Sequence, residues 1–139
     1  MPVVDRIPES FHDFFDRPIL AHLATVMPDG SPQVTPVWIG YADGLLLVNT
    51  IVGRQKDRNL GEQVRVALTM VDPDDPYRYL QVRGEVVEGT TEGAEDNIDQ
   101  LSLRYTGVPY PCHDPNRPRK LFKIKPTRVI YQERVGEIR

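Results

Sequence analysis

The chain has 139 residues, of which 40% are hydrophobic and 27% charged, with a formal net charge of −3 and a pI near 5.6. This acidic balance argues against a general attraction to nucleic acid or anionic membranes, so any cationic site has to be local. The single cysteine excludes an internal disulfide framework and fits a reducing compartment. No apolar run approaches the ~20 residues that span a bilayer, and no apolar stretch of a signal peptide follows the N-terminus. We therefore expect one cytoplasmic domain over residues 1–139.

The N-terminal region predicts a short helix. Pro8 suits a first helical turn, and Pro18 ends the pattern. Between and beside them, apolar side chains recur at helical spacing: Ile7, Phe11, Phe14 and Phe15. This pattern favours a helix that covers a core rather than one that carries a site.

Alternation of apolar and polar residues then predicts six short strands. The pairs Asp29-Gly30 and Asp43-Gly44 favour tight turns between them. The predicted strands cover residues 22–26, 33–41, 45–50, 64–71, 79–88 and 121–131. A change to helical spacing predicts a helix over 92–105, and a proline-rich loop follows over 109–118. Six strands with few helices predict a mainly β fold, built as a small antiparallel barrel.

The strand over 33–41 is apolar on both faces. One face carries Val34, Pro36 and Trp38, and the other carries Val37, Ile39 and Tyr41. A small barrel has only one interior, so the second face needs a ligand, a helix or another subunit. This pattern favours a homodimer; the alternative is that the N-terminal helix covers the second face.

The segment GRQKDRNL, residues 53–60, concentrates cations just after an apolar strand. If it is extended, Arg54, Lys56 and Arg58 point the same way; if it is helical, Arg54 and Arg58 share a face and free backbone N–H groups add to the attraction for an anion. A guanidinium makes a forked contact with phosphate, and an ammonium supplies a point charge. The alternative is a solvated loop that Asp57 partly neutralises.

The sequence contains no recognisable acid–base, nucleophilic or metal-binding group. The three histidines are scattered, and the adjacent Cys112 and His113 match no zinc pattern. There is no nucleophile elbow, phosphate-binding loop or dinucleotide fingerprint. An enzyme of this kind would need a cofactor to supply the reactivity. A phosphate-bearing cofactor at the basic segment, with its ring along the strand over 33–41, would account for both unusual features.

Several stretches resemble a known family when taken in order: LATVMPDGSPQVTPVW, LLLVNT, GRQKDRNL, VRVALTMVDPDDPYRYLQVRGEV and KIKPTRVIY. Together they resemble the flavin-binding split-barrel superfamily named after pyridoxamine 5'-phosphate oxidase, and within it the branch of oxidoreductases that use the deazaflavin coenzyme F-420. The resemblance covers nearly the whole chain. It implies a homodimer of six-stranded split β-barrels, with cofactor sites in grooves at the subunit interface.

The resemblance also implies which residues bind the cofactor. The segment matched by Arg54, Lys56, Asn59 and Leu60 would hold the phosphate, with Arg58 as an additional cation. The ring would lie along Thr35, Pro36, Val37 and Trp38 and beside the backbone that runs from Asn49 and Thr50 to Val52. Tyr77 and Tyr79 would lie near the groove, contributed by one subunit or the other.

The implied reaction is transfer of a hydride from reduced coenzyme F-420 to an electron-poor small-molecule substrate, with no side chain assigned as catalytic. The alternatives are an FMN-binding oxidoreductase of the same fold and a non-catalytic carrier or sensor of the cofactor. A nucleic-acid-binding barrel is disfavoured by the acidic pI. The ending ERVGEIR lacks the Arg- and His-containing motif with which pyridoxamine 5'-phosphate oxidases hold the vitamer, so no vitamin B6 chemistry is expected.

Overall fold

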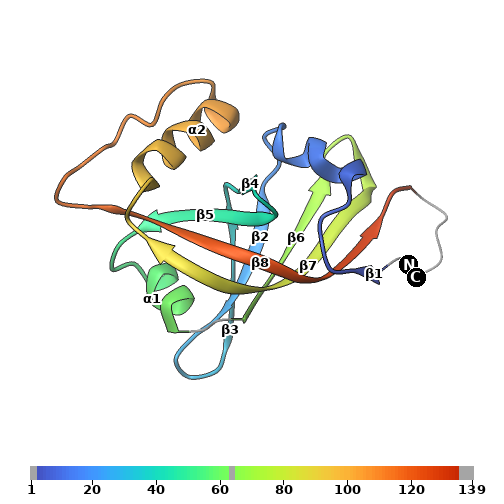
Figure 1. The fold of residues 1–139 in the computed structure, drawn as a ribbon, viewed down its shortest axis with the longest axis horizontal. Coiled ribbons are helices and arrows are strands. Elements are labelled where there is room, and N and C mark those ends of the chain that lie inside the picture. The colour runs from blue at the N-terminus through green and yellow to red at the C-terminus, as the bar shows by residue number, and fades with distance from the viewer. Residues whose placement is uncertain (1–2, 63–64, 135–139) are drawn as a thin grey trace.

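The computed structural model describes residues 3–62 and 65–134, and the described strands form one sheet. The strands are β1 (Val3–Val4), β2 (Ala21–Val26), β3 (Pro32–Val37), β4 (Gly40–Ala42), β5 (Leu45–Ile51), β6 (Arg65–Asp72), β7 (Asp75–Thr90) and β8 (Arg119–Gln132). Their order is β3-β2-β6-β7-β8-β5-β4, with β1 beside β8, and every pairing is antiparallel (Figure 1). Val64, expected in a strand, and residues 135–139 of the ERVGEIR ending lie outside the described residues. The prediction of a mainly β fold is confirmed.

Three helices accompany the sheet: the 3-10 helix η1 (Glu9–Phe15) and the α-helices α1 (Gln55–Glu62) and α2 (Ala94–Thr106). In Figure 1, η1 and α2 lie along the upper side of the sheet, and α1 lies below its left end. Glycines with positive φ flank α2, and the Gly107 N–H donates to the Leu103 carbonyl at 3.0 Å, which ends the helix. None of the helices in the described ranges is long and apolar enough to cross a membrane.

The core follows from the alternating pattern of the strands. Val66, Leu68 and Met70 of β6 are buried on the same side of the sheet as Leu80 and Val82 of β7. The helix η1 adds its apolar face to this core: Ile7, just before the helix, Phe11, Phe14 and Phe15 are all buried. The core therefore lies between the inner face of the sheet and η1.

The structure has eight described strands where the sequence predicted six. The short β1 was not expected, and the predicted strand over 33–41 divides into β3 and β4. The division occurs because the Ile39 N–H donates to the Tyr105 hydroxyl of α2 at 3.2 Å, and Trp38 stacks on the Tyr105 ring with centroids 5.4 Å apart. The chain consequently leaves β2 after Val37 and pairs with β5 from Gly40, so β3 and β4 become the two edges of an open sheet.

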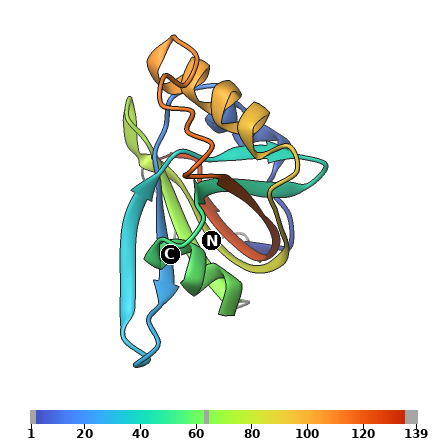
Figure 2. The ribbon, with the colours of Figure 1, turned by 90° about the vertical axis from the view of Figure 1, so that its left-hand side faces the viewer.

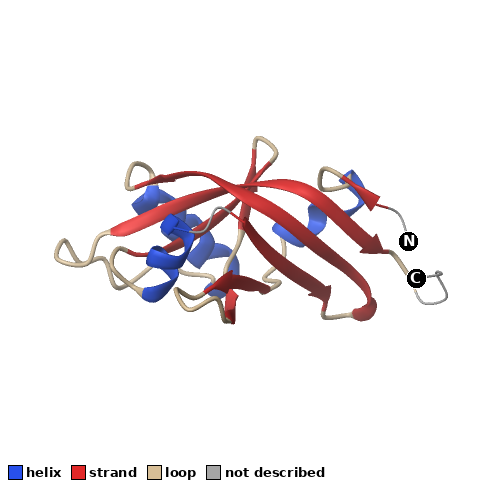
Figure 3. Cartoon of the chain, turned by 90° about the horizontal axis from the view of Figure 1, so that it is seen from below, coloured by secondary structure: helices blue, strands red, loops and turns tan. Residues whose placement is uncertain are grey.

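The long strands β7 and β8 bend across the molecule, which curls the sheet around the core (Figures 2 and 3). Gly84 lies where the register between β7 and β8 shifts. A Cβ atom there would lie 2.7 Å from Ile124 Cγ2 and 2.9 Å from the Lys125 carbonyl oxygen. Only glycine permits this close approach of the two strands.

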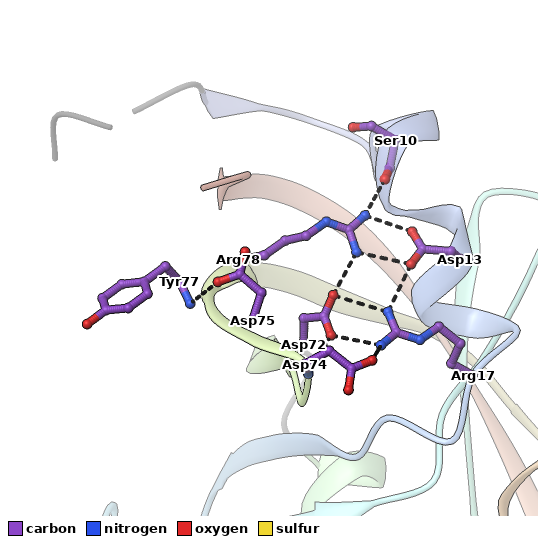
Figure 4. A network of polar contacts seen from close by, with 8 residues as sticks. All are labelled: Ser10, Asp13, Arg17, Asp72, Asp74, Asp75, Tyr77 and Arg78. Atoms are coloured by element: carbon purple, nitrogen blue, oxygen red, sulfur yellow. Dashed lines mark hydrogen bonds and ion pairs between the residues drawn. The ribbon is translucent and has the colours of Figure 1, made fainter. Parts of the chain in front are cut away.

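Charged side chains fasten η1 to the turn between β6 and β7 (Figure 4). Arg17 contacts Asp72 at 2.8 Å, and Arg78 contacts Asp13 at 2.8 Å and Asp72 at 3.0 Å. The Arg78 guanidinium also lies over the Phe11 and Phe14 rings, at 4.7 and 4.8 Å from their centroids. We refer to Asp13, Arg17, Asp72, Asp74 and Arg78 as the ion-paired cluster.

The sequence left open what covers the second face of the strand over 33–41. The helix η1 packs on the face of Val37 and Ile39, where the Phe15 ring stacks on Tyr41 with centroids 5.0 Å apart. On the other face, Pro36 is exposed and Val34 is 61% exposed. The alternative that the N-terminal helix covers this second face is therefore wrong.

Candidate functional site

The basic segment after β5 folds into a helix. Gly53 adopts a φ of +90°, and the following residues turn directly into α1. The Gly53 N–H donates to Asp57 Oδ2 at 2.7 Å, and the Arg54 N–H donates to the Ile51 carbonyl at 3.2 Å. Of the two conformations left open by the sequence, the helical one is present, but these two N–H groups already have acceptors within the chain.

The inner side of α1 anchors the helix to the sheet. Asn59, which is 2% exposed, donates through Nδ2 to Thr25 Oγ1 at 3.1 Å and to Gln33 Oε1 at 3.2 Å. Asp57 is buried, and its Oδ1 lies 3.2 Å from Lys120 Nζ. Leu60 is 1% exposed. The helix is thus held against β2, β3 and β8, and the Asn59 side chain positions α1 rather than facing solvent.

The three cations of the segment differ in their contacts. Arg58 folds back on its own turn, donating to the Gly53 carbonyl at 2.8 Å and to Gln55 Oε1 at 3.0 Å. The side chains of Arg54 and Lys56 have no hydrogen bond or ion pair with any residue in the ranges 3–62 and 65–134. Arg54 is exposed, whereas Lys56 is partly buried.

The surroundings of Lys56 disfavour its charged form. Burial is the main cause that lowers its pKa, and the positive charges of Arg54 and Arg119 lower it further. A solvated loop would leave a lysine with its ordinary pKa. A partly buried ammonium without a counter-ion, next to two guanidiniums, is instead expected at a site that receives an anion.

Arg119 brings a further cation to this region from the start of β8. Its Nε donates to Asn49 Oδ1 at 2.7 Å, and Asn49 Nδ2 donates to the Ala94 carbonyl at 2.8 Å. The Arg119 guanidinium also lies 5.2 Å from the centroid of the Tyr110 ring. Asn49 therefore joins β5 to α2 and orients Arg119, while its neighbour Thr50 is buried at 4% exposure.

A cavity of about 480 Å³ opens beside these cations. It is lined by Ile51, Arg54, Tyr110, Cys112, His113, Asp114, Arg117 and Arg119. We refer to Arg54, Lys56, Arg117 and Arg119 as the cation cluster. None of the four makes an ion pair with an acidic residue in the described part of the chain.

The residues predicted to line the ring follow β3 away from α1. Thr35 is partly buried, Pro36 is exposed, and the Val37 side chain is 7% exposed. Trp38 lies at the end of the strand, stacked on Tyr105. Because Gln33 contacts Asn59 of α1, β3 runs from α1 to Val37, the residue before Trp38, over about 13 Å of strand at roughly 3.3 Å per residue.

The structure places Tyr77 and Tyr79 away from the other predicted cofactor-binding residues. Both lie in the first part of β7, which begins far from α1 (Figure 1), and Tyr77 lies beside the ion-paired cluster (Figure 4). Tyr77 is 49% exposed, and its N–H donates to Asp75 Oδ1 at 3.1 Å. Within one chain these tyrosines are not brought to the cation cluster, so any role at that site requires a second subunit.

Sequence reasoning missed Arg117 and Arg119 as site residues. The signal was present, since NRPRK places cations around the start of β8 as GRQKDR places them just after β5. The pairing of β5 with β8, in which Ile51 lies opposite Arg119, then brings the two basic segments together. No group of three His, Cys, Asp or Glu side chains in the described ranges is arranged to hold a metal ion.

A second hollow, of about 500 Å³, lies on the outer face of β2, β6 and β7. Its apolar side chains include Ala24, Val26 and Ala67. Ala24 pairs with Val34 on one side and Ala67 on the other, so the exposed face of β3 continues into this hollow. This is an apolar surface next to the edge strand.

Comparisons with known proteins agree with the fold and show the family. A family model described as pyridoxamine 5'-phosphate oxidase matches residues 7–133. A solved structure of an F-420 reductase is 35% identical, with a TM-score of 0.79, and the match covers 89% of this chain and 98% of that one. A conserved hypothetical protein from Mycobacterium tuberculosis is 24% identical over 94% of this chain and 88% of that one, with a TM-score of 0.71, which supports the fold alone. A search of curated protein sequences finds no match.

Proposed function

Because the chain belongs to the pyridoxamine 5'-phosphate oxidase family, we propose that it is an oxidoreductase that uses reduced coenzyme F-420 to reduce an electron-poor organic substrate. The similarity to an F-420 reductase supports the choice of a deazaflavin over a flavin. The observation that carries the proposal is the state of Lys56, a partly buried cation with a lowered pKa and no anionic partner among the described residues.

The residues around α1 fit the phosphate of such a cofactor. Arg54 and Lys56 have no competing acceptors among the residues that the structure describes, and they would bind the phosphate directly. Arg58 already donates to Gly53 and Gln55. It would therefore hold the turn in place and add its positive charge, without bonding to the phosphate. Asn59 would keep α1 in place.

The ring would lie toward the far end of β3. Trp38 is fixed there by stacking on Tyr105, and the Tyr105 hydroxyl donates to the Ile19 carbonyl at 2.5 Å. The partly buried Thr35 lies between Trp38 and α1 on the same strand. The side chains of Val37 and Thr50 are buried, and that of Asn49 is hydrogen-bonded to α2. These residues would therefore fix the position of the backbone beside the ring.

When bound, a reduced deazaflavin supplies a hydride as a two-electron donor. The contribution of this chain is to bind the anionic group, to orient the ring beside Trp38 and to exclude water. No side chain in this region is proposed as an essential acid.

A homodimer would complete the site. The exposed Val34 and Pro36 and the adjoining hollow form an apolar surface that a second copy can cover. Tyr77 and Tyr79 of the partner subunit would then be the tyrosines that approach the ring. A cytoplasmic location remains part of the proposal and rests on the single cysteine.

The proposal is tested by titrating the protein with coenzyme F-420 and, separately, with FMN. Trp38 is the only tryptophan, so quenching of its emission reports binding at the expected place. We expect Lys56→Ala to weaken F-420 binding by about 1.5–3 kcal/mol, or roughly 10- to 150-fold, because a charged hydrogen bond is lost.

Lys125→Ala is the matched control, since Lys125 is an exposed lysine on β8, and it should bind as the unmodified chain does. Unchanged affinity in Lys56→Ala would move the phosphate to another place. Tight binding of FMN with no affinity for F-420 would replace the proposal with an FMN-dependent oxidoreductase. Binding without turnover of any hydride acceptor would leave a cofactor carrier.

A further inference from the structure

We infer that the cavity between the start of α1 and the loop over residues 107–118 binds a second anionic group, a carboxylate or a phosphate, separate from the group held at Lys56. The cavity has a volume of about 480 Å³, which is within the usual range for small-molecule sites. Lys56 does not line it. The inference concerns a site beyond the one assigned to the cofactor phosphate.

The charges that line this cavity are unbalanced. Three arginines line it, Arg54, Arg117 and Arg119, against a single acid, Asp114. Asp114 accepts from the Asn116 N–H at 2.9 Å within its own turn. The side chains of Arg54 and Arg117 have no hydrogen bond or ion pair with any described residue.

Arg119 keeps most of its donors available. Its Nε is used by Asn49, and Nη1 makes only a long contact of 3.5 Å with the Tyr110 hydroxyl. The positive charges of Arg54 and Arg117 lower the pKa of Arg119, although burial is the main cause. Three guanidiniums that repel one another around one cavity are stabilised when an anion accepts their hydrogen bonds.

The acids that could have neutralised the arginines are occupied by His113. The His113 ring contacts Glu95 through Nδ1 and Asp99 through Nε2, the latter at 2.8 Å. Asp99 also accepts the Tyr110 N–H at 3.0 Å. These contacts attach the loop to α2, so the cavity wall is preformed, and they bond both carboxylates to His113, while the charge of Glu95 acts on Arg119 without an ion pair.

The test uses Cys112, the only cysteine of the chain, which is exposed and lines the cavity. The rate of its alkylation by iodoacetamide, a neutral reagent, is measured by mass spectrometry against the concentration of inorganic pyrophosphate at constant ionic strength. An anion in the cavity blocks access of the reagent to the Cys112 thiol, so we expect saturable slowing of at least about threefold.

Arg117→Gln should raise the half-saturating concentration of pyrophosphate about tenfold, because a charged contact is lost. Arg128→Gln, at an exposed arginine on β8, should leave it unchanged. Slowing that does not saturate in the unmodified chain, that persists equally in Arg117→Gln, or that disappears in Lys56→Ala would overturn the inference.

The source of the anion is distinguished by repeating the measurement with coenzyme F-420. If F-420 slows alkylation in the unmodified chain, the second anionic group belongs to the same ligand. If F-420 quenches Trp38 without slowing alkylation, the cavity serves a separate small anion. If F-420 does not bind at all, the proposed function fails, but the pyrophosphate measurement still tests the cavity.

Discussion

The ion-paired cluster at the β6–β7 turn and the cation cluster around α1 both contain arginines. The cations of the first are paired with carboxylates, whereas those of the second lie beside other cations. In the first, Asp13 and Asp72 raise the pKa of Arg78, and the guanidinium of Arg17 is the main cause that lowers the pKa of Asp72. In the second, burial and neighbouring cations lower the pKa of Lys56. A cation whose pKa is raised is stabilised by the fold, whereas one whose pKa is lowered is a cost to it.

This difference separates structural charges from charges available to a ligand. The ion-paired cluster joins η1 to the sheet, and its arginines are already paired with carboxylates of the chain. The cation cluster contributes little to holding elements together, since the anchoring of α1 depends on Asn59, Asp57 and Leu60. Removing a charged side chain should therefore destabilise the fold at the ion-paired cluster and reduce the repulsion between cations at the cation cluster.

The largest effect is expected at the ion-paired cluster. Asp72→Ala removes the buried one of the two carboxylates that Arg17 and Arg78 share and leaves them only the more exposed Asp13 in common, so it should lower the free energy of unfolding by about 3 kcal/mol. This is the low end of the range for such a loss, because the two arginine side chains remain 29% and 20% exposed. Urea denaturation measures the change.

Asp74 supplies the control for this prediction. It contacts the same Arg17 at 2.9 Å, but its side chain is 86% exposed. Asp74→Ala should cost about 0.5 kcal/mol or less. Equal losses in the two variants would show that burial does not distinguish the members of this cluster.

A smaller effect of opposite sign is expected at the cation cluster. Lys56→Met keeps the apolar stem and removes the charge, so it should raise the free energy of unfolding by about 0.5 kcal/mol in buffer without multivalent anions. Adding inorganic phosphate should stabilise the unmodified chain more than Lys56→Met, because only the former retains the ammonium.

Thermal unfolding with and without phosphate measures both changes. A Lys56→Met variant that is less stable than the unmodified chain in the absence of phosphate would mean that Lys56 supports the fold. The contrast between the two clusters would then be lost.

The same contrast explains how much could be predicted from the sequence. The strands and α2 were found because alternation and helical spacing are local patterns, and the turns at Gly30 and Gly44 do have positive φ. The basic segment was also found locally. Which cations are paired was not, because Arg17 and Asp72 are 55 residues apart in the chain.

Tertiary contacts also decided the features that sequence reasoning missed. The division of the strand over 33–41 depends on a hydrogen bond from the Ile39 N–H to Tyr105, 66 residues away. Arg119 joins the cation cluster only because β5 pairs with β8. The Arg58 side chain adopts a rotamer that bonds to Gly53 and Gln55, and residue spacing alone does not determine that rotamer.

The smallest expected effect concerns His113, which lines the cavity and has acidic partners in Glu95 and Asp99. Asp99 is the main cause that raises the pKa of His113 above its ordinary value of 6.5, and Glu95 adds to it. Because the pKa is raised in the folded state, the stabilisation is fully present below pH 6.5 and is lost as the pH rises through the folded-state pKa. The pair is solvent-exposed, so the unfolding midpoint should fall by only roughly one to two degrees over this window.

His113→Gln should remove this pH dependence, whereas His22→Gln, at an exposed histidine on β2, should preserve it. Thermal unfolding from pH 5.5 to 9 measures the difference between the variants, and an NMR titration of the imidazole measures the pKa directly. The pKa should return toward 6.5 in Asp99→Asn, because the main partner is lost. A His113 pKa at or below 6.5 in the unmodified chain would show that Glu95 and Asp99 do not hold a charged imidazole, and the two acids would then be available to neutralise the arginines beside them.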